Sequence, residues 1–194
     1  VRARTDQILG VHDCSLTVEE GEILVLMGLS GSGKSTLLRA VNGLNPVVRG
    51  DVRIKTAQGM TSVTNADKAT LRALRLHDVA MVFQQFGLLP WRTVRDNVGL
   101  GLELAGMDKV ARNRRVAEEL ALVGLDDRAD ALVGELSGGM QQRVGLARAF
   151  ATDAPILLMD EPFSALDPLI RTKLQDELLD LQRDRNRTII FVSH

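Results

Sequence analysis

Residues 28–35 constrain this chain more than any other stretch, because they read GLSGSGKS and match the phosphate-binding pattern G-x-x-x-x-G-K-[ST] at every fixed position. Glycines let successive backbone N–H groups face one anion, Lys34 supplies a cation for phosphates, and the Ser35 hydroxyl is a ligand for Mg²⁺. The preceding run ILVLM at 23–27 is typical of a strand buried on both faces, and a helical apolar pattern follows the loop up to Gly43. Strand, loop and helix in this order predict nucleotide binding, with the phosphates at a helix N-terminus.

The composition of the 194-residue chain is that of an ordinary soluble globule, with 45% hydrophobic residues and a formal net charge of −1. This charge argues against nucleic-acid binding through bulk electrostatics. The single cysteine, Cys14, excludes a disulfide framework and fits a reducing cytosol, and no charge-free apolar run approaches the length of a membrane span. We expect one domain. Because the chain opens on Val1 and closes on His194 directly after an apolar strand, we also expect a fragment trimmed at both ends.

Apolar periodicity predicts an α/β core interrupted by a helical subdomain at 91–151, a region without strand-like runs. Residues 6–18 alternate in places as a half-buried antiparallel strand does, and Thr64 with Asp67 is a candidate cap for a short helix. The core then comprises 1–90 and 152–194, with further strands at 52–54, 79–83, 156–159 and 188–192, helices beginning near Thr93, Ser137 and Asp167, and one marked by Val116, Leu120 and Val123.

Candidate site residues follow four of the predicted strands: the phosphate loop, Gln84, the pair Asp160-Glu161, and His194. In an open α/β sheet the carboxyl ends of the strands form the edge at which ligands bind. Asp160 is suited to hold Mg²⁺, and Glu161 to polarise a water for attack on a γ-phosphate. The alternative is that the acidic pair merely ends a strand, which is the weaker interpretation beside an intact phosphate loop.

A second glycine cluster reads LSGGMQQR at 136–143. Ser137 is a helix cap and is followed by Gly138 and Gly139, so this cluster predicts a second anion site at a helix N-terminus. Since the chain already has a phosphate loop, a second such site suggests a nucleotide shared between two chains. The alternative is a capped tight turn without a ligand, which accounts for one glycine better than for two.

Taken in order, the phosphate loop, Gln84, LSGGM at 136–140, DE at 160–161, SALD at 164–167 and the final histidine resemble the nucleotide-binding domain of ABC transporters over nearly the whole chain. The resemblance implies a RecA-like P-loop core with a small antiparallel β region and an inserted helical subdomain. It also implies ATP and Mg²⁺ as ligands, and a head-to-tail homodimer with two ATP molecules between phosphate loop and signature.

The same resemblance implies a role for each matching residue. Gln84 corresponds to the Q-loop residue near Mg²⁺ and the attacking water, with Gln85 as the alternative choice. Glu161, Gln84 and His194 are the implied catalytic residues, His194 being the switch histidine, and Asp167 is the D-loop residue. The implied ligand contacts are Gly28, Leu29, Ser30, Gly31, Ser32, Gly33, Lys34, Ser35 and Thr36 for ATP, Ser35, Gln84 and Asp160 for the metal, and Ser137, Gly138, Gly139 and Met140 for the ATP of the other chain.

A closer likeness is to the ATPase subunits of bacterial importers of quaternary amines such as glycine betaine, choline and proline betaine. It rests on residues 28–32, 83–90 and 160–171 and on the Met140 variant of the signature. It implies a peripheral subunit on the cytoplasmic face of the inner membrane. The implied partners are permease subunits facing residues 86–98 and a periplasmic or lipid-anchored substrate-binding protein, without nucleic acid.

One feature departs from the family pattern. ABC ATPases usually stack adenine on an aromatic residue before the phosphate loop, but here Thr5 lies near that place and Phe83 is the first aromatic residue. An importer of another small solute is the main alternative. An ABC ATPase of DNA repair would need a long coiled-coil or zinc-bearing insertion, and a tandem translation factor would need a second phosphate loop.

Overall fold

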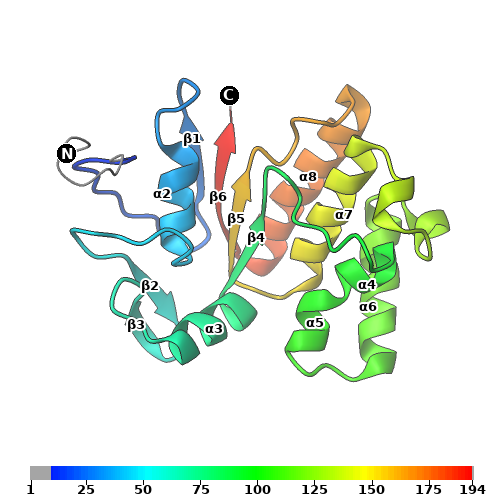
Figure 1. The fold of residues 1–194 in the computed structure, drawn as a ribbon, viewed down its shortest axis with the longest axis horizontal. Helices are drawn as coiled ribbons and strands as arrows, with labels where there is room; N and C mark the ends of the chain where they lie inside the picture. Colours follow the sequence, from blue (N-terminus) through cyan, green and yellow to red (C-terminus); the bar gives the residue numbers. More distant parts are fainter. Residues whose placement is uncertain (1–9, 194) are drawn as a thin grey trace.

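The computed structural model describes residues 10–193, apart from the side chains of residues 181, 184 and 185 (Figure 1). Thr5, His194 and the start of the stretch predicted as a strand at 6–18 lie outside the described residues. A parallel four-stranded sheet forms the centre, in the order β1 (Ile23–Met27), β6 (Thr188–Ser193), β5 (Ile156–Asp160) and β4 (Val79–Val82). Because all four strands run in one direction, the loops that follow them meet at one edge of the sheet.

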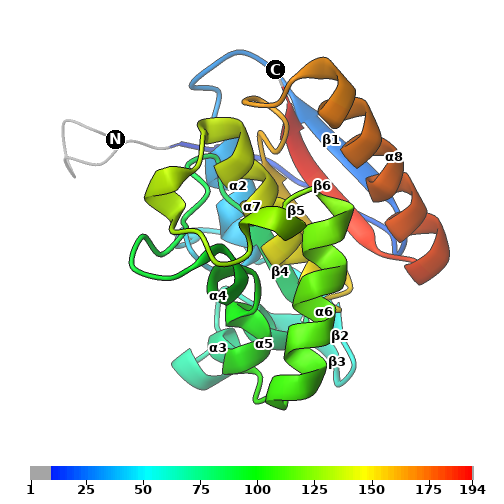
Figure 2. The ribbon, with the colours of Figure 1, turned by 90° about the vertical axis from the view of Figure 1, so that its right-hand side faces the viewer.

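Helices cover both faces of this sheet (Figures 1 and 2). Alternate residues of a strand point to opposite faces, so β5 contributes to two separate cores. Leu157 and Met159 pack with helices α7 (Gly138–Ala151) and α8 (Pro168–Arg185), whereas Leu158 packs on the side of α2 (Lys34–Val41) and α3 (Lys68–His77). The predicted α/β class with a parallel sheet is therefore confirmed.

Two expectations about strands are wrong. Strand β1 is an edge strand in the described part of the sheet, with Val25 39% and Met27 71% exposed, and is not buried on both faces. An apolar run indicates a hydrophobic strand, but it does not indicate whether that strand lies at the centre or at the edge of the sheet. Residues 10–18 form no strand, because a short alternation without a pairing partner does not make one.

The small antiparallel β region is present as β2 (Arg53–Thr56) paired with β3 (Gly59–Ser62). Helix α3 follows it and is capped by Asp67, whose carboxylate accepts a hydrogen bond of 2.7 Å from the backbone N–H of Thr70. Thr64 is not the cap: its hydroxyl accepts from the backbone N–H of Val52 and so ties the loop to the β2 region instead.

Between β4 and β5 lie the helices α4 (Val94–Val98), α5 (Leu100–Leu104), α6 (Lys109–Leu122) and α7, with short 3₁₀ turns at Asp126–Arg128 and Val133–Glu135. The Thr93 hydroxyl caps α4 as predicted, and the chain starts a new helix after Gly99. Helix α7 packs on the sheet beside β4, and the other three helices pack on α7. Leu120 of α6 and Leu157 of β5 thereby belong to one hydrophobic cluster. Along residues 10–193 no helix combines the length and the apolar character that crossing a bilayer requires.

Candidate functional site

The phosphate loop joins β1 to α2, and its shape depends on glycine. Gly33 caps α2 with a left-handed φ of 92°, and a Cβ there would collide with the backbone carbonyl of Gly10. The cap provides no side-chain acceptor, and the first turn of α2 contains no acidic residue. The N–H groups at the start of α2 therefore have no side chain of their own to bind, which is the arrangement that suits an anion.

Lys34 lies across this loop. Its Nζ donates to the carbonyl oxygens of Gly28 at 2.7 Å and Leu29 at 2.8 Å, so the ammonium is held beside the exposed backbone of the loop. The Leu29 side chain is 84% exposed. The predicted ATP contacts thus form one solvent-facing loop with a cation at its centre.

Asp160, at the end of β5, is fully buried and is held by two residues of α2. The Ser35 hydroxyl donates to Asp160 Oδ1 at 2.7 Å, and Arg39 Nη2 lies 2.9 Å from Asp160 Oδ2. A buried carboxylate needs such partners, because an isolated charge is costly in the interior. Arg39 was not predicted, although it stands four residues after Ser35 and therefore on the same helix face.

The oxygens of Ser35 and Asp160 are suitable ligands for Mg²⁺. This ion prefers hard oxygen donors, usually keeps several waters, and takes only one or two carboxylates from the protein together with substrate phosphates. The described residues contain no group of three His, Cys, Asp or Glu side chains that could hold a metal by themselves. The donor set therefore fits a magnesium ion bound chiefly by a nucleotide, with few protein ligands.

Gln84 follows β4 and is exposed. It lies in an open cavity that also includes Arg39, so the cavity reaches the group that holds Asp160. Gln85 lines the same cavity, and the geometry does not choose between the two glutamines. The lining consists of Arg39, Leu44, Asn45, Phe83, Gln84, Gln85 and Gly87.

Glu161 has a left-handed backbone with a φ of 52°, which is uncommon for a residue other than glycine. Its N–H donates to the carbonyl of Val192 in β6, and its own carbonyl accepts from Gln142 of α7. Strain of this kind persists only where the surroundings impose it, and it concentrates at functional sites.

The second glycine cluster forms the start of α7. Ser137 caps the helix as predicted, its hydroxyl accepting from the N–H of Met140 at 3.3 Å. A Cβ on Gly139 would lie 2.9 Å from the carbonyl oxygen of Ala165, whereas a Cβ on Gly138 would meet nothing within 4 Å. Packing therefore explains Gly139 and leaves Gly138 unexplained.

The structure brings the predicted residues into two groups. Ser35, Asp160 and, through Arg39, Gln84 meet at the phosphate loop. The signature residues instead contact the segment after Glu161, and helices α2 and α7 lie on opposite faces of the sheet (Figure 1). Within residues 10–193 no backbone–backbone hydrogen bond joins the two groups. Asp167 caps α8 by accepting from the N–H of Ile170, and its D-loop role stays a prediction.

Comparison with known proteins gives a consistent result. The chain is 52% identical to the glycine betaine/proline betaine transport system ATP-binding protein ProV of Escherichia coli K12, in an alignment that covers 98% of this chain and 47% of that protein. It is 50% identical to the trimethylamine N-oxide transport system ATP-binding protein TmoW of Ruegeria pomeroyi, in an alignment that covers 96% of this chain and 54% of that protein. The chain thus spans about half the length of these curated relatives.

A solved structure supports the same assignment. The dimeric post-hydrolysis state of an ATP-binding cassette bound to ADP and Pi superposes with a TM-score of 0.87 at 36% identity, over 92% of this chain and 77% of that one. The family profile described as ABC transporter matches residues 11–164, which is more than three quarters of the chain. On this evidence the chain belongs to the ABC transporter family.

Proposed function

We propose that this chain binds and hydrolyses ATP to drive a membrane importer of small methylated amines. The observation that carries the ATP site is the contact between the Ser35 hydroxyl and the buried Asp160 carboxylate beside the phosphate loop. That contact supports the proposal because it pairs two oxygen atoms of the kind that a nucleotide-bound Mg²⁺ prefers as ligands. A phosphate-loop sequence without a neighbouring carboxylate such as Asp160 would support an ATP site much less strongly.

The residues around the loop divide the work of hydrolysis. Lys34 and the first N–H groups of α2 bind the phosphates, and Ser35 with Asp160 hold the magnesium ion, which when bound neutralises developing charge on the phosphates. Glu161 accepts a proton from the attacking water, and Gln84 orients that water. His194, as the switch histidine, completes the proposed catalytic set.

The active form is a head-to-tail homodimer. In it Ser137, Gly138, Gly139 and Met140 of one chain bind the γ-phosphate held by the phosphate loop of the other. The unexplained Gly138 supports this arrangement, because it is an exposed helix-start glycine that the fold does not require. The similar cassette solved as a dimer with ADP and Pi supports it as well. Asp167 belongs to the same shared interface.

The transported solute is a quaternary amine such as glycine betaine, proline betaine or choline. The glycine betaine/proline betaine relative at 52% identity supports this class, and the trimethylamine N-oxide relative at 50% identity favours a second candidate, the amine oxide. We place the chain on the cytoplasmic face of the inner membrane. Permease subunits contact residues 86–98 there, and a periplasmic or lipid-anchored binding protein delivers the solute.

Uptake and hydrolysis measured together test this function. Cells lacking the gene should lose uptake of labelled glycine betaine and regain it with the wild-type gene. Glu161→Gln should not restore uptake, because the amide keeps the shape but lacks a basic oxygen, and hydrolysis should fall by about two to three decades while ATP binding persists.

Glu118→Gln is the matched control. Glu118 is a half-exposed carboxylate on α6 whose ion pair with Arg115 spans 3.8 Å, and the substitution should leave both activities unchanged. Wild-type hydrolysis by Glu161→Gln would refute the catalytic assignment. Uptake of trimethylamine N-oxide without glycine betaine would replace the solute but keep the ATPase.

A further inference from the structure

Helix α7 sends a buried side chain to the loop that carries Glu161. Gln142 is 1% exposed, and its Nε2 donates to the carbonyl of Glu161 at 3.1 Å while its Oε1 accepts from the N–H of Ala165 at 2.9 Å. The amide therefore bridges both ends of the turn after β5. A side chain without both a donor and an acceptor cannot make this bridge.

Six residues later the same helix reaches the loop that carries Gln84. Arg148 donates through Nη2 to the carbonyl of Phe86 at 2.6 Å and through Nη1 to that of Gly87 at 2.8 Å. Burial lowers the pKa of Arg148 from its ordinary value, although an arginine stays charged in any case. One guanidinium thus binds two successive carbonyls through two separate nitrogens in a fixed planar arrangement, whereas a lysine has a single nitrogen for both contacts, as Lys34 shows at the phosphate loop.

Both contacted loops have an unusual backbone at the point of contact. Phe86 has a φ of 59° and Glu161 a φ of 52°, both in the left-handed region that side chains disfavour. They are two of only four such non-glycine residues in the described part of the chain, the others being Asp13 and Asn186. Glu161 is itself a proposed catalytic residue, and Phe86 lies two residues after Gln84. The carbonyl oxygen of each accepts a hydrogen bond from a side chain of α7.

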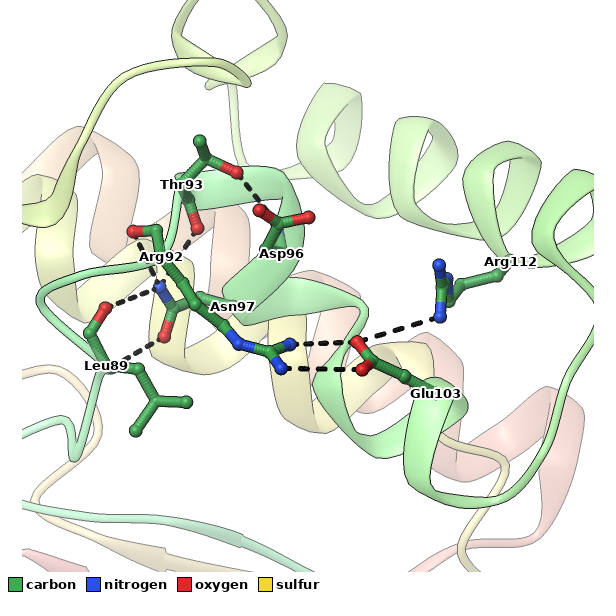
Figure 3. A network of polar contacts seen from close by, with 7 residues as sticks. All are labelled: Leu89, Arg92, Thr93, Asp96, Asn97, Glu103 and Arg112. Carbon is green, nitrogen blue, oxygen red and sulfur yellow. Dashed lines mark hydrogen bonds and ion pairs between the residues drawn. The ribbon is translucent and has the colours of Figure 1, made fainter.

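The loop that carries Gln84 runs from β4 to α4, and its end next to α4 is also held by hydrogen bonds (Figure 3). Asn97 of α4 is fully buried; its Nδ2 donates to the carbonyls of Leu89, Arg92 and Thr93, and its Oδ1 accepts from the N–H of Leu89. Beside it Arg92 pairs with Glu103 and holds the pKa of that carboxyl below its ordinary value. Arg148 thus binds the stretch next to Gln84, whereas Asn97 binds the other end of the same loop.

We propose that Gln142 and Arg148 are positioning residues, through which helix α7 holds the backbone of both loops in the conformation needed for hydrolysis. The inference rests on the proposed ATPase function. Because the signature forms the first turn of α7, a shift of this helix would move the Glu161 loop and the Gln84 loop together. Neither side chain touches the nucleotide in this role.

The chain provides a matched control for Arg148 in the same helix. Arg143 also donates to two successive backbone carbonyls, here through Nη1 alone, of Val123 at 2.8 Å and Gly124 at 3.1 Å, and Gly124 is also left-handed with a φ of 64°. Arg143 therefore makes the same kind of contact to a loop without proposed catalytic residues. Gln141 is the corresponding control for Gln142, since its amide donates to the carbonyls of Val133 and Leu136.

The test compares Arg148→Met with Arg143→Met, and Gln142→Leu with Gln141→Leu, in the full-length protein with its membrane partners. The measured quantities are kcat, KM for ATP, and Tm. We expect the two positioning variants to lose about ten- to hundredfold in kcat with KM little changed, because misplacement of reacting groups by about 1 Å has effects of this size. The controls should share any loss of Tm but keep kcat.

Arg148→Lys covers the case in which Arg148→Met does not fold. It keeps the cation but not the fork, so we expect a kcat between those of Arg148→Met and wild type. The inference is overturned if Arg148→Lys matches wild type, or if each positioning variant has the kcat of its control. Wild type and Lys34→Ala are run alongside: an inactive wild type would count against the proposed function, whereas an active wild type with equal pairs counts against the positioning role alone.

Discussion

Two helices in the described part of the chain begin at a glycine cluster, yet only one of them combines an uncapped N-terminus with a nearby cation and a buried carboxylate. Helix α2 starts at Gly33 without a side-chain cap, has Lys34 in its first turn, and lies beside the buried Asp160. Helix α7 starts at Ser137, whose hydroxyl already binds one of the first N–H groups, and its first turn contains no acidic residue. The two glycine clusters are similar in sequence, but the side chains that surround them in the fold differ.

The difference indicates how the two ends are used. Because α2 combines a cation, a proposed magnesium ligand and N–H groups without a side-chain cap, we propose that it binds a nucleotide by itself. The start of α7 has only an exposed glycine and a few N–H groups, so it contributes when a phosphate is brought to it. Each substitution predicted below, apart from one control, changes the N-terminus of either α2 or α7.

The largest effect is expected for Lys34→Ala. The loop loses its central cation, so ATP binding should weaken by about a hundredfold and hydrolysis should fall below detection. Equilibrium binding of a labelled ATP analogue and a phosphate-release assay measure the two effects. Near-normal turnover would show that α2 is not the primary nucleotide site.

Gly138→Asp should abolish hydrolysis and leave ATP binding intact. The added side chain has open space in its own chain, and a carboxylate at a helix start is not destabilising, so folding should be preserved. At a shared phosphate site the same carboxylate repels the anion.

Mixing Gly138→Asp chains with Lys34→Ala chains then separates the two beginnings. Head-to-tail sharing leaves one composite site with both beginnings intact, so partial recovery of hydrolysis is expected once sizing confirms mixed dimers. Wild-type hydrolysis by strictly monomeric Gly138→Asp chains would contradict sharing.

A smaller effect separates the two signature glycines by stability. Gly139→Ala should lower the free energy of unfolding by about 1–3 kcal/mol, because its Cβ would press on the Ala165 carbonyl. Gly138→Ala should cause no loss, since alanine is the better helix former and has room. Urea unfolding of both variants measures the difference, and equal losses would show that Gly138 is also required by packing.

The smallest effect is expected for Ser137→Ala, which removes the cap of α7 and should cost about 1 kcal/mol. Thr93→Ala is the matched control, because the Thr93 hydroxyl caps α4 in the same way. Both variants should lose similar stability, but only Ser137→Ala should also lower the rate of hydrolysis. If the rate of hydrolysis is unchanged in both Ser137→Ala and Thr93→Ala, Ser137 serves only as a helix cap.

Much of the fold was predictable because its signals are local. Asp67, Thr93, Ser137 and Asp167 cap helices where a short polar side chain precedes an apolar pattern. The exposure of Val25 was not predictable, because it depends on which strand pairs with β1 and not on the sequence of β1 itself.

For the candidate site, motifs predicted which residues to consider, and the structure added how they are held. The pairing of Ser35 with Asp160 joins residues 125 positions apart, and Arg148 reaches a loop about 60 positions earlier. Contacts at such separations leave no periodic trace in one sequence. The roles of Gln84, Glu161 and Asp167 remain predictions.

Because one hydrophobic cluster contains both Leu120 and Leu157, we expect the helical segment and the sheet to unfold as one cooperative unit. Neither part can lose its packing without exposing apolar surface of the other. A ligand that binds only the folded chain therefore raises the free energy of opening throughout this unit. Nucleotide at the phosphate loop should slow amide hydrogen exchange in α6, a helix that does not border the loop, by the same mass action that protects α2.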